Sequence, residues 1–137
     1  MLRVVIDTNV LVSAIISDGK PRALLQKGLD RQFSIVISDQ LLDELFTVLN
    51  RPKLKTSKDE IDKIMLAMKK SAEVVKVRSK FKAVNNDPKD DAIVHAACDG
   101  QADMIVSGDG HLLDLESFRG IKIVSVREML ELLKKTG

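Results

Sequence analysis

The stretch Leu2-Arg3-Val4-Val5-Ile6-Asp7-Thr8-Asn9-Val10-Leu11 decides the fold class of this chain. It opens with a short, largely apolar run that suits a buried strand, and a helical apolar pattern over residues 10–16 follows directly. Asp7 stands between the two, at the end of a strand that we expect to lie centrally in a sheet. In an open α/β sheet, the functional crevice lies outside the carboxyl ends of the strands. The stretch therefore predicts both a kind of sheet and the edge at which a site would form.

Strands and helices are expected to alternate along the rest of the chain. Further strand-like segments cover residues 33–37, 74–77, 104–106 and 121–124. Helical patterns cover residues 21–29, 39–49, 58–71 and 88–100, and a last one begins after Ser125. Serine caps precede three of these helices, at Ser38, Ser57 and Ser125. The alternation predicts an α/β fold, a three-layer α/β/α sandwich with a central parallel sheet of about five strands.

Length and composition describe one ordinary globular domain that spans residues 1–137. The hydrophobic share is 45% and the charged share is 31%, values that suit a folded chain with an adequate core. Cys98 is the only cysteine, which excludes an internal disulfide and a cysteine-based zinc site. No signal peptide or membrane-spanning stretch is recognisable, and a lone thiol suits a reducing compartment. We therefore expect a cytoplasmic protein with no membrane contact.

Basic residues gather in one part of the chain. Residues 51–82 hold eleven of the 22 Lys and Arg and only four of the 20 acids, so this part carries +7 although the whole chain carries +2. A solvated helical face is the ordinary explanation of such a run, and a polyanion held by lysines also fits it. The chain has four Phe and no Trp or Tyr, so base stacking on exposed rings is a poor explanation of any nucleic-acid binding.

Four acidic residues that are far apart in the chain are expected to gather at one edge of the sheet. Asp7 and Asp109 follow predicted strands, whereas Glu44 and Asp91 lie on helices that can lean over the same edge. Carboxylates that crowd together repel one another and resist ionising, so such a cluster usually indicates a bound cation. Oxygen ligands favour Mg²⁺ or Mn²⁺ over zinc. The pattern points to a hard divalent metal and to phosphate chemistry.

Asp90 and Asp91 compete for one place in this cluster. Pro88 suits the first helical position, which makes Asp87 the cap of the helix. Asp90 then occupies the third helical position, from which an acid can reach back to the cap. Asp91 is left without a capping role, so it is the preferred site residue, and Asp90 is the alternative.

Glu44 is separated from its neighbour Asp43 by the periodicity of their helix. At about 100° per residue, the leucines of residues 41–49 form one apolar arc, which Glu44 borders and Asp43 opposes. An acid at the border of a buried face needs a metal, a water or a basic partner. Glu44 is therefore expected in the site, whereas solvent explains Asp43.

The acids at the strand ends have ordinary explanations too. The helix that follows the first strand could be capped by Asp7 itself, by Thr8 or by Asn9. Asp109 stands among glycines, where a plain turn accounts for it equally well. The hydroxyls of Thr8 and Ser107, beside these two acids, suit hydrogen bonds to metal ligands or a contact with phosphate.

The acids and their surroundings resemble the PIN-domain ribonucleases, particularly the small single-domain type, similar to VapC, that serves as the toxin of toxin–antitoxin pairs. The pieces that match, in order, are Val5-Ile6-Asp7-Thr8-Asn9-Val10-Leu11, residues 38–45 with Glu44, residues 90–97, and Ile105-Val106-Ser107-Gly108-Asp109. Four short motifs in order cover nearly the whole chain, which makes the resemblance specific. Ser107 stands where many relatives carry Thr, and either hydroxyl could do the same work.

The resemblance implies RNA cleavage that depends on Mg²⁺ or Mn²⁺. The catalytic cluster would consist of Asp7, Glu44, Asp91 and Asp109, of which all but Glu44 would be metal ligands. Thr8, Asn9, Ser107 and Asp90 would support the ligands or contact phosphate. Apart from the resemblance, the basic residues of 51–82 are expected to hold the RNA backbone, with Arg51 and Lys53 nearest the Glu44 helix. The resemblance also implies a homodimer and a cognate antitoxin protein.

Other functions remain as alternatives. A non-catalytic RNA-binding or scaffolding domain of the same fold would keep the architecture, although the presence of all four acids argues against it. A phosphoryl-accepting receiver domain needs an acidic pair after its first strand, where this chain has Asp7, Thr8 and Asn9. A dehalogenase-like phosphatase would want an acid in place of Asn9. The absence of a glycine-rich loop ending in Lys-Ser or Lys-Thr excludes a P-loop enzyme.

Overall fold

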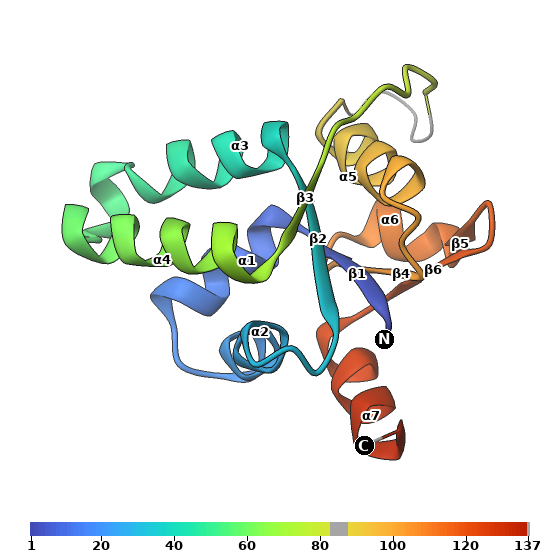
Figure 1. Cartoon of the computed structure of the whole chain (residues 1–137), viewed down its shortest axis with the longest axis horizontal. Helices are drawn as coiled ribbons and strands as arrows, with labels where there is room; N and C mark the ends of the chain where they lie inside the picture. Colours follow the sequence, from blue (N-terminus) through green and yellow to red (C-terminus); the bar gives the residue numbers. More distant parts are fainter. Residues whose placement is uncertain (83–87, 137) are drawn as a thin grey trace.

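The computed structural model describes residues 1–82 and 88–136, which form an α/β structure around a six-stranded sheet (Figure 1). The strands are β1 (Arg3–Ile6), β2 (Ser34–Ser38), β3 (Glu73–Val75), β4 (Met104–Val106), β5 (Ser117–Phe118) and β6 (Ile121–Val124). Their order across the sheet is β3-β2-β1-β4-β6-β5, and all neighbours are parallel except β5 and β6. The predicted sandwich with a mainly parallel sheet is confirmed, and β1 lies inside the sheet as expected.

The described helices lie between these strands and at the end of the chain. They are α1 (Thr8–Ile16), α2 (Lys20–Leu29), α3 (Asp39–Leu49), the 3₁₀ helix η1 (Pro52–Leu54), α4 (Lys58–Ser71), α5 (Pro88–Asp99), α6 (Gly110–Leu115) and α7 (Val126–Thr136). The hydroxyls of Ser38, Ser57 and Ser125 accept hydrogen bonds from backbone N–H groups of α3, α4 and α7, as the sequence predicted. The expected cap of α5, Asp87, lies outside the described residues.

Helices cover both faces of the sheet. In Figure 1, α1 to α4 lie to the left of the central strands and α5 lies to their upper right. The helix α5 packs against β1, β2 and β4, whereas α2 packs against β2 and contacts α1, α4 and α7. The central strands are consequently buried on both faces, and the side chains of residues 4–6, 35–37 and 104–106 belong to the core. The carboxyl ends of β1, β2 and β4 meet at one edge.

Three local features differ from the sequence prediction. The helix α6 and the strand β5 were not predicted, because six and two residues are too few to show a periodic pattern. The hairpin from β5 to β6 turns through Arg119 and Gly120, which both have positive φ angles, of 49° and 84°. The strand β3 was expected at residues 74–77 but ends at Val75, since Asp99 hydrogen-bonds the backbone of residues 78 and 79 and draws this segment towards α5.

The sequence predicted no membrane-spanning stretch. Among the helices in the described part of the chain, none is both long enough and apolar enough to cross a membrane.

Candidate functional site

The buried polar side chains of the molecule gather at the carboxyl edge of the sheet. Among the described residues, these side chains are Asp7, Thr8, Ser38, Asp90 and Ser107. Strand register explains the grouping, because Val5 pairs with Val36 of β2 and Ile6 pairs with Val106 of β4. The residues that follow these pairs therefore lie beside one another at the strand ends. The helix α5 leads back into β4, so its first turn, with Asp90, lies at the same edge.

Asp7 connects two elements of this edge. Its Oδ1 accepts a hydrogen bond from the backbone N–H of Asn9, at 3.2 Å, which makes Asp7 the N-cap of α1. Its Oδ2 accepts a hydrogen bond from the hydroxyl of Ser107, at 2.7 Å. Of the three caps that the sequence left open, Asp7 is thus the one that the structure uses. The side chain of Asn9 is exposed, so this residue contributes its backbone N–H to the edge.

Ser107 also links Asp7 to Asp109. Its Oγ accepts a hydrogen bond from the backbone N–H of Asp109, at 3.0 Å, while its proton goes to Asp7. The Oδ1 of Asp109 accepts from the N–H groups of His111, at 2.7 Å, and Leu112, at 3.4 Å, so Asp109 caps α6. Asp7, Ser107 and Asp109 therefore lie close together, as the sequence predicted. The buried hydroxyl of Ser107 links the other two residues.

Thr8, the first residue of α1, follows Asp7 and has a buried hydroxyl. Its side chain is 2% exposed, and its Oγ1 has no hydrogen-bond partner among the described residues. A buried hydroxyl without a partner costs about 1–3 kcal/mol, so a native environment normally supplies a water, an ion or a ligand. The hydroxyl oxygen of Thr8 is therefore available to bind a ligand at the carboxyl edge of the sheet.

Asp90 and Asp91 differ in burial, and the difference runs against the preference drawn from the sequence. Asp90 is 4% exposed, whereas Asp91 is half-buried. The periodicity of α5 explains this, because Asp90 shares its face with the buried residues Ile93, Val94 and Ala97. Asp91 shares its face with His95, which is only half-buried. The apolar positions three, four and seven residues after Asp90 are the sequence signal for this burial.

Glu44 stands on α3, beyond Ser38. It is half-buried and makes no hydrogen bond or ion pair with another described residue, whereas its neighbour Asp43 is exposed. This contrast agrees with the predicted difference between the two acids. Among the described residues, however, no three acidic, histidine or cysteine side chains lie close enough together to hold a metal ion.

The two predicted RNA contacts lie away from the acidic edge. Arg51 and Lys53 are exposed and follow the far end of α3, a helix of eleven residues that begins at the edge after Ser38. A helix of this length spans about 16 Å. The structure thus separates these two cations from the strand ends by the length of α3.

The donor types at the edge fit a hard divalent cation. The carboxylates of Asp7 and Asp90 are buried together with the unpartnered hydroxyl of Thr8, and all of these donors are oxygen atoms. Buried carboxylates need compensation, and Mg²⁺ or Mn²⁺ prefers oxygen ligands. Cys98, the one thiol, is half-buried, and desolvation raises its pKa, so it suits neither metal binding nor nucleophilic chemistry.

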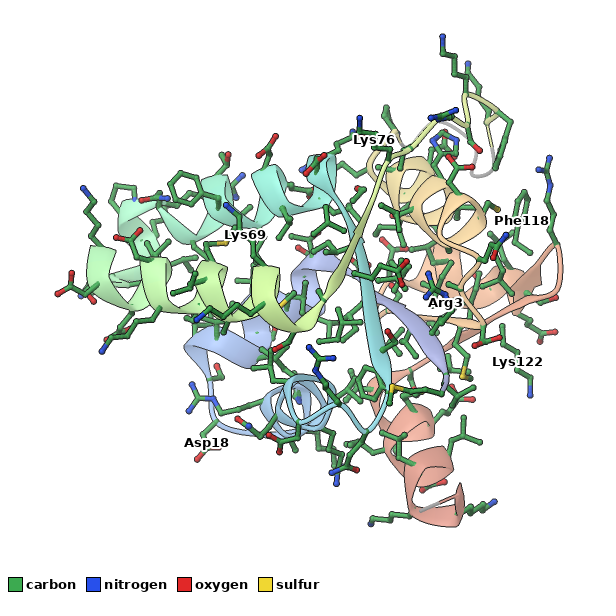
Figure 2. All side chains as sticks on the ribbon, in the orientation of Figure 1. Arg3, Asp18, Lys69, Lys76, Phe118 and Lys122 are labelled. Atoms are coloured by element: carbon green, nitrogen blue, oxygen red, sulfur yellow. The ribbon has the colours of Figure 1, made fainter. Side chains whose placement is uncertain are left out.

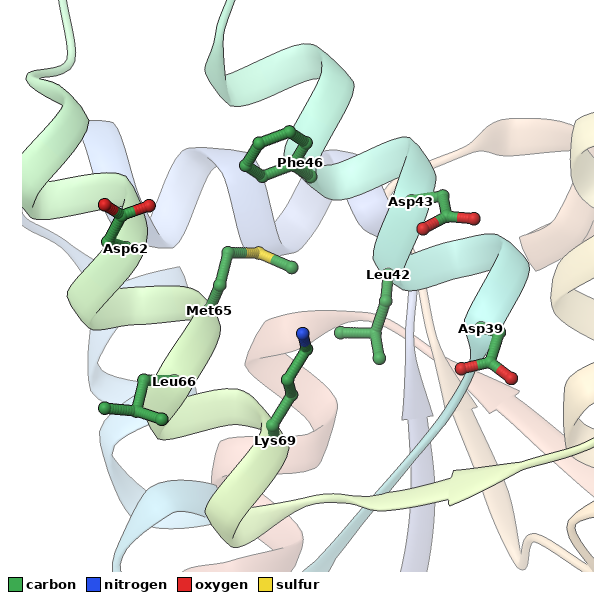
Figure 3. Close-up of a pocket in the computed structure, with 8 residues that line it drawn as sticks. All are labelled: Asp39, Leu42, Asp43, Phe46, Asp62, Met65, Leu66 and Lys69. Atoms are coloured by element: carbon green, nitrogen blue, oxygen red, sulfur yellow. The ribbon is translucent and has the colours of Figure 1, made fainter.

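A second surface feature lies between α3 and α4. A groove of about 450 Å³ is lined there by Asp39, Leu42, Asp43, Phe46, Asp62, Met65, Leu66 and Lys69. Figure 3 shows Met65 of α4 reaching towards α3, between Phe46 and Leu42. Two large apolar side chains of this groove are unusually open to solvent, Phe46 at 46% and Leu66 at 55%. The groove is separate from the buried acids and has the character of a contact surface.

Known proteins share both the sequence pattern and the fold. The chain is 29% identical over 118 residues to the uncharacterized protein MJ1680 of Methanocaldococcus jannaschii, a match that covers 83% of this chain and 75% of that protein. The VapBC2 structure of Rickettsia felis, bound to a DNA fragment from their promoter, has a TM-score of 0.58 at 17% identity and covers 90% of this chain and 98% of its own. The PAE2754 structure of Pyrobaculum aerophilum has a TM-score of 0.61 at 14% identity, with 98% and 90% covered.

The two solved structures share the fold of this chain. The family follows from the sequence itself, since the sequence model of the family described as PIN domain matches residues 3–111. This range contains β1, β2 and β4 and all five acids considered for the site. The resemblance seen in the sequence is confirmed, and the chain belongs to the PIN domain family.

Proposed function

We propose that this protein is a divalent-metal-dependent ribonuclease that cleaves RNA phosphodiester bonds at the acidic edge of its sheet. The observation that carries the proposal is the burial of Asp7 and Asp90 beside the unpartnered hydroxyl of Thr8 at the carboxyl ends of β1 and β4. PIN domains are generally nucleases and typically use divalent metals, so family membership supports hydrolysis of nucleic acid. Metal dependence and the choice of RNA are the proposed part.

The metal would be held by Asp7, Asp109 and an acid of the Asp90–Asp91 pair, with Asp90 preferred for its burial. Bound Mg²⁺ or Mn²⁺ supplies a Lewis acid that stabilises charge on phosphate and lowers the pKa of a water. Glu44 is proposed as a further ligand or as the base that accepts the proton of the attacking water at its carboxylate.

The remaining residues of the edge position these acids. Ser107 donates to Asp7 Oδ2 and accepts from the N–H of Asp109, so its hydroxyl fixes two proposed ligands at once. The backbone N–H of Asn9 fixes the other oxygen of Asp7. Thr8 offers its hydroxyl to the metal, to a water or to a phosphate oxygen.

Cleavage of labelled single-stranded RNA by the purified protein tests the proposal. Product should form with Mn²⁺ or Mg²⁺ and disappear with EDTA, and adding metal in excess should restore it. Cleavage that persists in EDTA would refute metal dependence. The second candidate, a non-catalytic RNA-binding domain, is favoured by the observation that no three acids converge among the described residues. It would bind the same RNA and leave it intact with either metal.

We further propose that the protein is the toxin of a toxin–antitoxin pair and acts as a homodimer. The family resemblance supports this role, and the groove between α3 and α4 provides an apolar surface for an antitoxin. The product of an adjacent small reading frame, co-expressed with this chain, should co-purify with it and suppress cleavage. Phe46→Asp and Leu66→Asp should each weaken the complex. Absence of such a partner would refute the toxin role, and a monomeric mass by light scattering would refute the homodimer.

A further inference from the structure

Residues 76–82, which we call the cationic strap, continue from β3 and pass along α5 (Figure 1). Exposure alternates along this segment. Lys76, Arg78, Lys80 and Lys82 are exposed, whereas the residues between them, Val77, Ser79 and Phe81, are half-buried. This period of two is the pattern of an extended chain that turns one side inward. The outward side of the strap therefore carries four positive charges.

The inward side of the strap is fixed to α5 by Asp99. The carboxylate of Asp99 accepts hydrogen bonds from the backbone N–H of Arg78, at 2.6 Å, and from the N–H and hydroxyl of Ser79, at 2.8 and 2.6 Å. The hydrogen bonds from Ser79 and Arg78 hold the pKa of Asp99 below its ordinary value, so this anchor stays charged.

A second anchor lies at Phe81. The carbonyl oxygen of Phe81 is hydrogen-bonded to Nε2 of His95. The ring of Phe81 packs edge-on against the ring of His95 and stacks on the ring of Phe118. Arg119 covers the same ring at 4.2 Å. In the orientation of Figure 2, Lys76 lies on one side of α5 and Phe118 on the other. The two anchors hold the backbone in place, so the outward charges are arranged before any partner binds.

The outward cations have no competing partner in the part of the chain that the structure describes. Among the described residues, no hydrogen bond or ion pair involves the side chains of Lys76, Arg78, Lys80 or Lys82. No acid lies within the strap itself. The strap is thus a run of uncompensated positive charge on a chain whose net charge is only +2.

The beginning of the strap adjoins the acidic edge. Lys76 and Arg78 line a cavity of about 530 Å³ together with Ser38, the last residue of β2, and with Asp39 and Gln40. The strand β2 is the direct neighbour of β1, whose end carries Asp7. A polyanion that lies along the strap can therefore continue over Ser38 towards the buried acids. Arg51 and Lys53 instead follow the far end of α3.

The geometry points to the cationic strap as the surface that binds the phosphate backbone of single-stranded RNA and leads it to the acidic edge. Alternate residues of an extended chain are about 6.6 Å apart, so successive cations can meet different phosphates. The ring of Phe81 is engaged by His95 and Phe118, so the contact is made through charge and reads no bases. The identity of the ligand as RNA rests on the proposed function. The location of the binding surface rests on the exposed and anchored cations of the strap.

Binding of a labelled, unstructured RNA in EDTA tests the strap without cleavage. The four cations of the strap are changed together, as Lys76→Gln, Arg78→Gln, Lys80→Gln and Lys82→Gln. The control removes four exposed lysines elsewhere, as Lys20→Gln, Lys122→Gln, Lys134→Gln and Lys135→Gln, and so matches the change in net charge. The strap variant should bind about tenfold or more weakly, and its salt slope should fall by about 2–3, since each phosphate contributes about 0.7. The control should stay within about twofold of the unchanged protein.

Each outcome decides between the proposals. Equal affinity of the strap variant and the unchanged protein, or an equal loss in the control, would overturn the strap proposal while metal-dependent cleavage could still stand. If the RNA binds through the strap but is not cleaved in Mn²⁺, the result would support the strap as the binding surface and refute the proposed nuclease activity. A charge-conserving variant with Lys76→Arg, Lys80→Arg and Lys82→Arg should bind normally, and a loss there would overturn the role of charge. Equally tight binding of polyglutamate would overturn RNA as the ligand.

Discussion

The carboxyl edge of the sheet and the cationic strap both concentrate charge, and they do so in opposite ways. At the edge, Asp7 and Asp90 are buried, and strand register together with the Ser107 hydroxyl positions Asp7. On the strap, the cationic side chains are exposed, and the chain is held through its backbone and through Ser79 and Phe81, by Asp99 and His95. Burial suits groups that share a metal, whereas exposure suits groups that must meet a long and variable polyanion. The difference in burial supports the proposed chemistry at the edge and the proposed binding at the strap.

Asp7→Asn should have the largest effect on cleavage. The change removes the charge of a proposed ligand but keeps a residue that can cap α1, so the fold should survive. We expect a loss of about a hundredfold or more, because changes to residues that merely support metal ligands already cost about 10–100-fold. RNA binding in EDTA should change little. Asp18→Asn, on an exposed loop, is the matched control and should cleave normally. Full activity of the Asp7 variant would refute the proposal that cleavage takes place at the acidic edge.

Asp90→Asn and Asp91→Asn sharpen the assignment within the edge. The buried Asp90 should prove the more important, with a loss of activity at least about tenfold larger than that of the Asp91 variant. The cleavage rate as a function of Mn²⁺ concentration is the measurement, since loss of a ligand also raises the metal concentration that is required. A larger loss in the Asp91 variant would restore the preference drawn from the capping argument.

Ser107→Ala should have a smaller effect on activity and a measurable effect on stability. The change removes the donor to Asp7 and the acceptor for the Asp109 N–H, which costs about 1–3 kcal/mol of the free energy of unfolding. Thermal unfolding and cleavage should both respond, with activity falling about tenfold. Ser107→Thr keeps the hydroxyl and should recover most of both. Loss of activity in the threonine variant equal to that in the alanine variant would contradict the role of the hydroxyl.

Asp99→Asn should have the smallest effect, confined to the strap. It weakens the charge-assisted bonds from residues 78 and 79, so hydrogen exchange at their N–H groups should accelerate while global unfolding changes by less than about 1–2 kcal/mol.

The pH dependence of this anchor follows from its lowered pKa. Because the folded pKa lies below the ordinary aspartate value of 3.8, the stabilisation is present above that value and is lost as the pH falls through the folded pKa. Exchange at residues 78 and 79 should therefore be protected from neutral pH down to the ordinary aspartate range and lose protection below it. Unchanged protection in the asparagine variant would mean that Asp99 does not hold the strap.

Much of the molecule was predictable from the sequence because its elements carry their own signals. The serine caps of α3, α4 and α7 formed as predicted, since a cap depends only on residues three positions apart. The choice between Asp90 and Asp91 was less predictable, because capping and burial favour different residues and the residue expected to cap the helix, Asp87, lies outside the described part. The strap shows its alternation in the sequence, but the side that faces α5 depends on Asp99 and His95, which come later in the chain.

The sequence by itself determined the alternation of strands and helices and the PIN family, because apolar periodicity and short motifs are local properties of the chain. It also determined that Asp7 and Asp109 follow strands. Only the tertiary structure decided which side chains share the edge, because register between β1 and β4 brings Ser107 to Asp7 across a hundred residues. It likewise decided that Arg51 and Lys53 lie beyond α3 and that the strap adjoins Ser38, since distances between elements depend on packing and not on position in the chain.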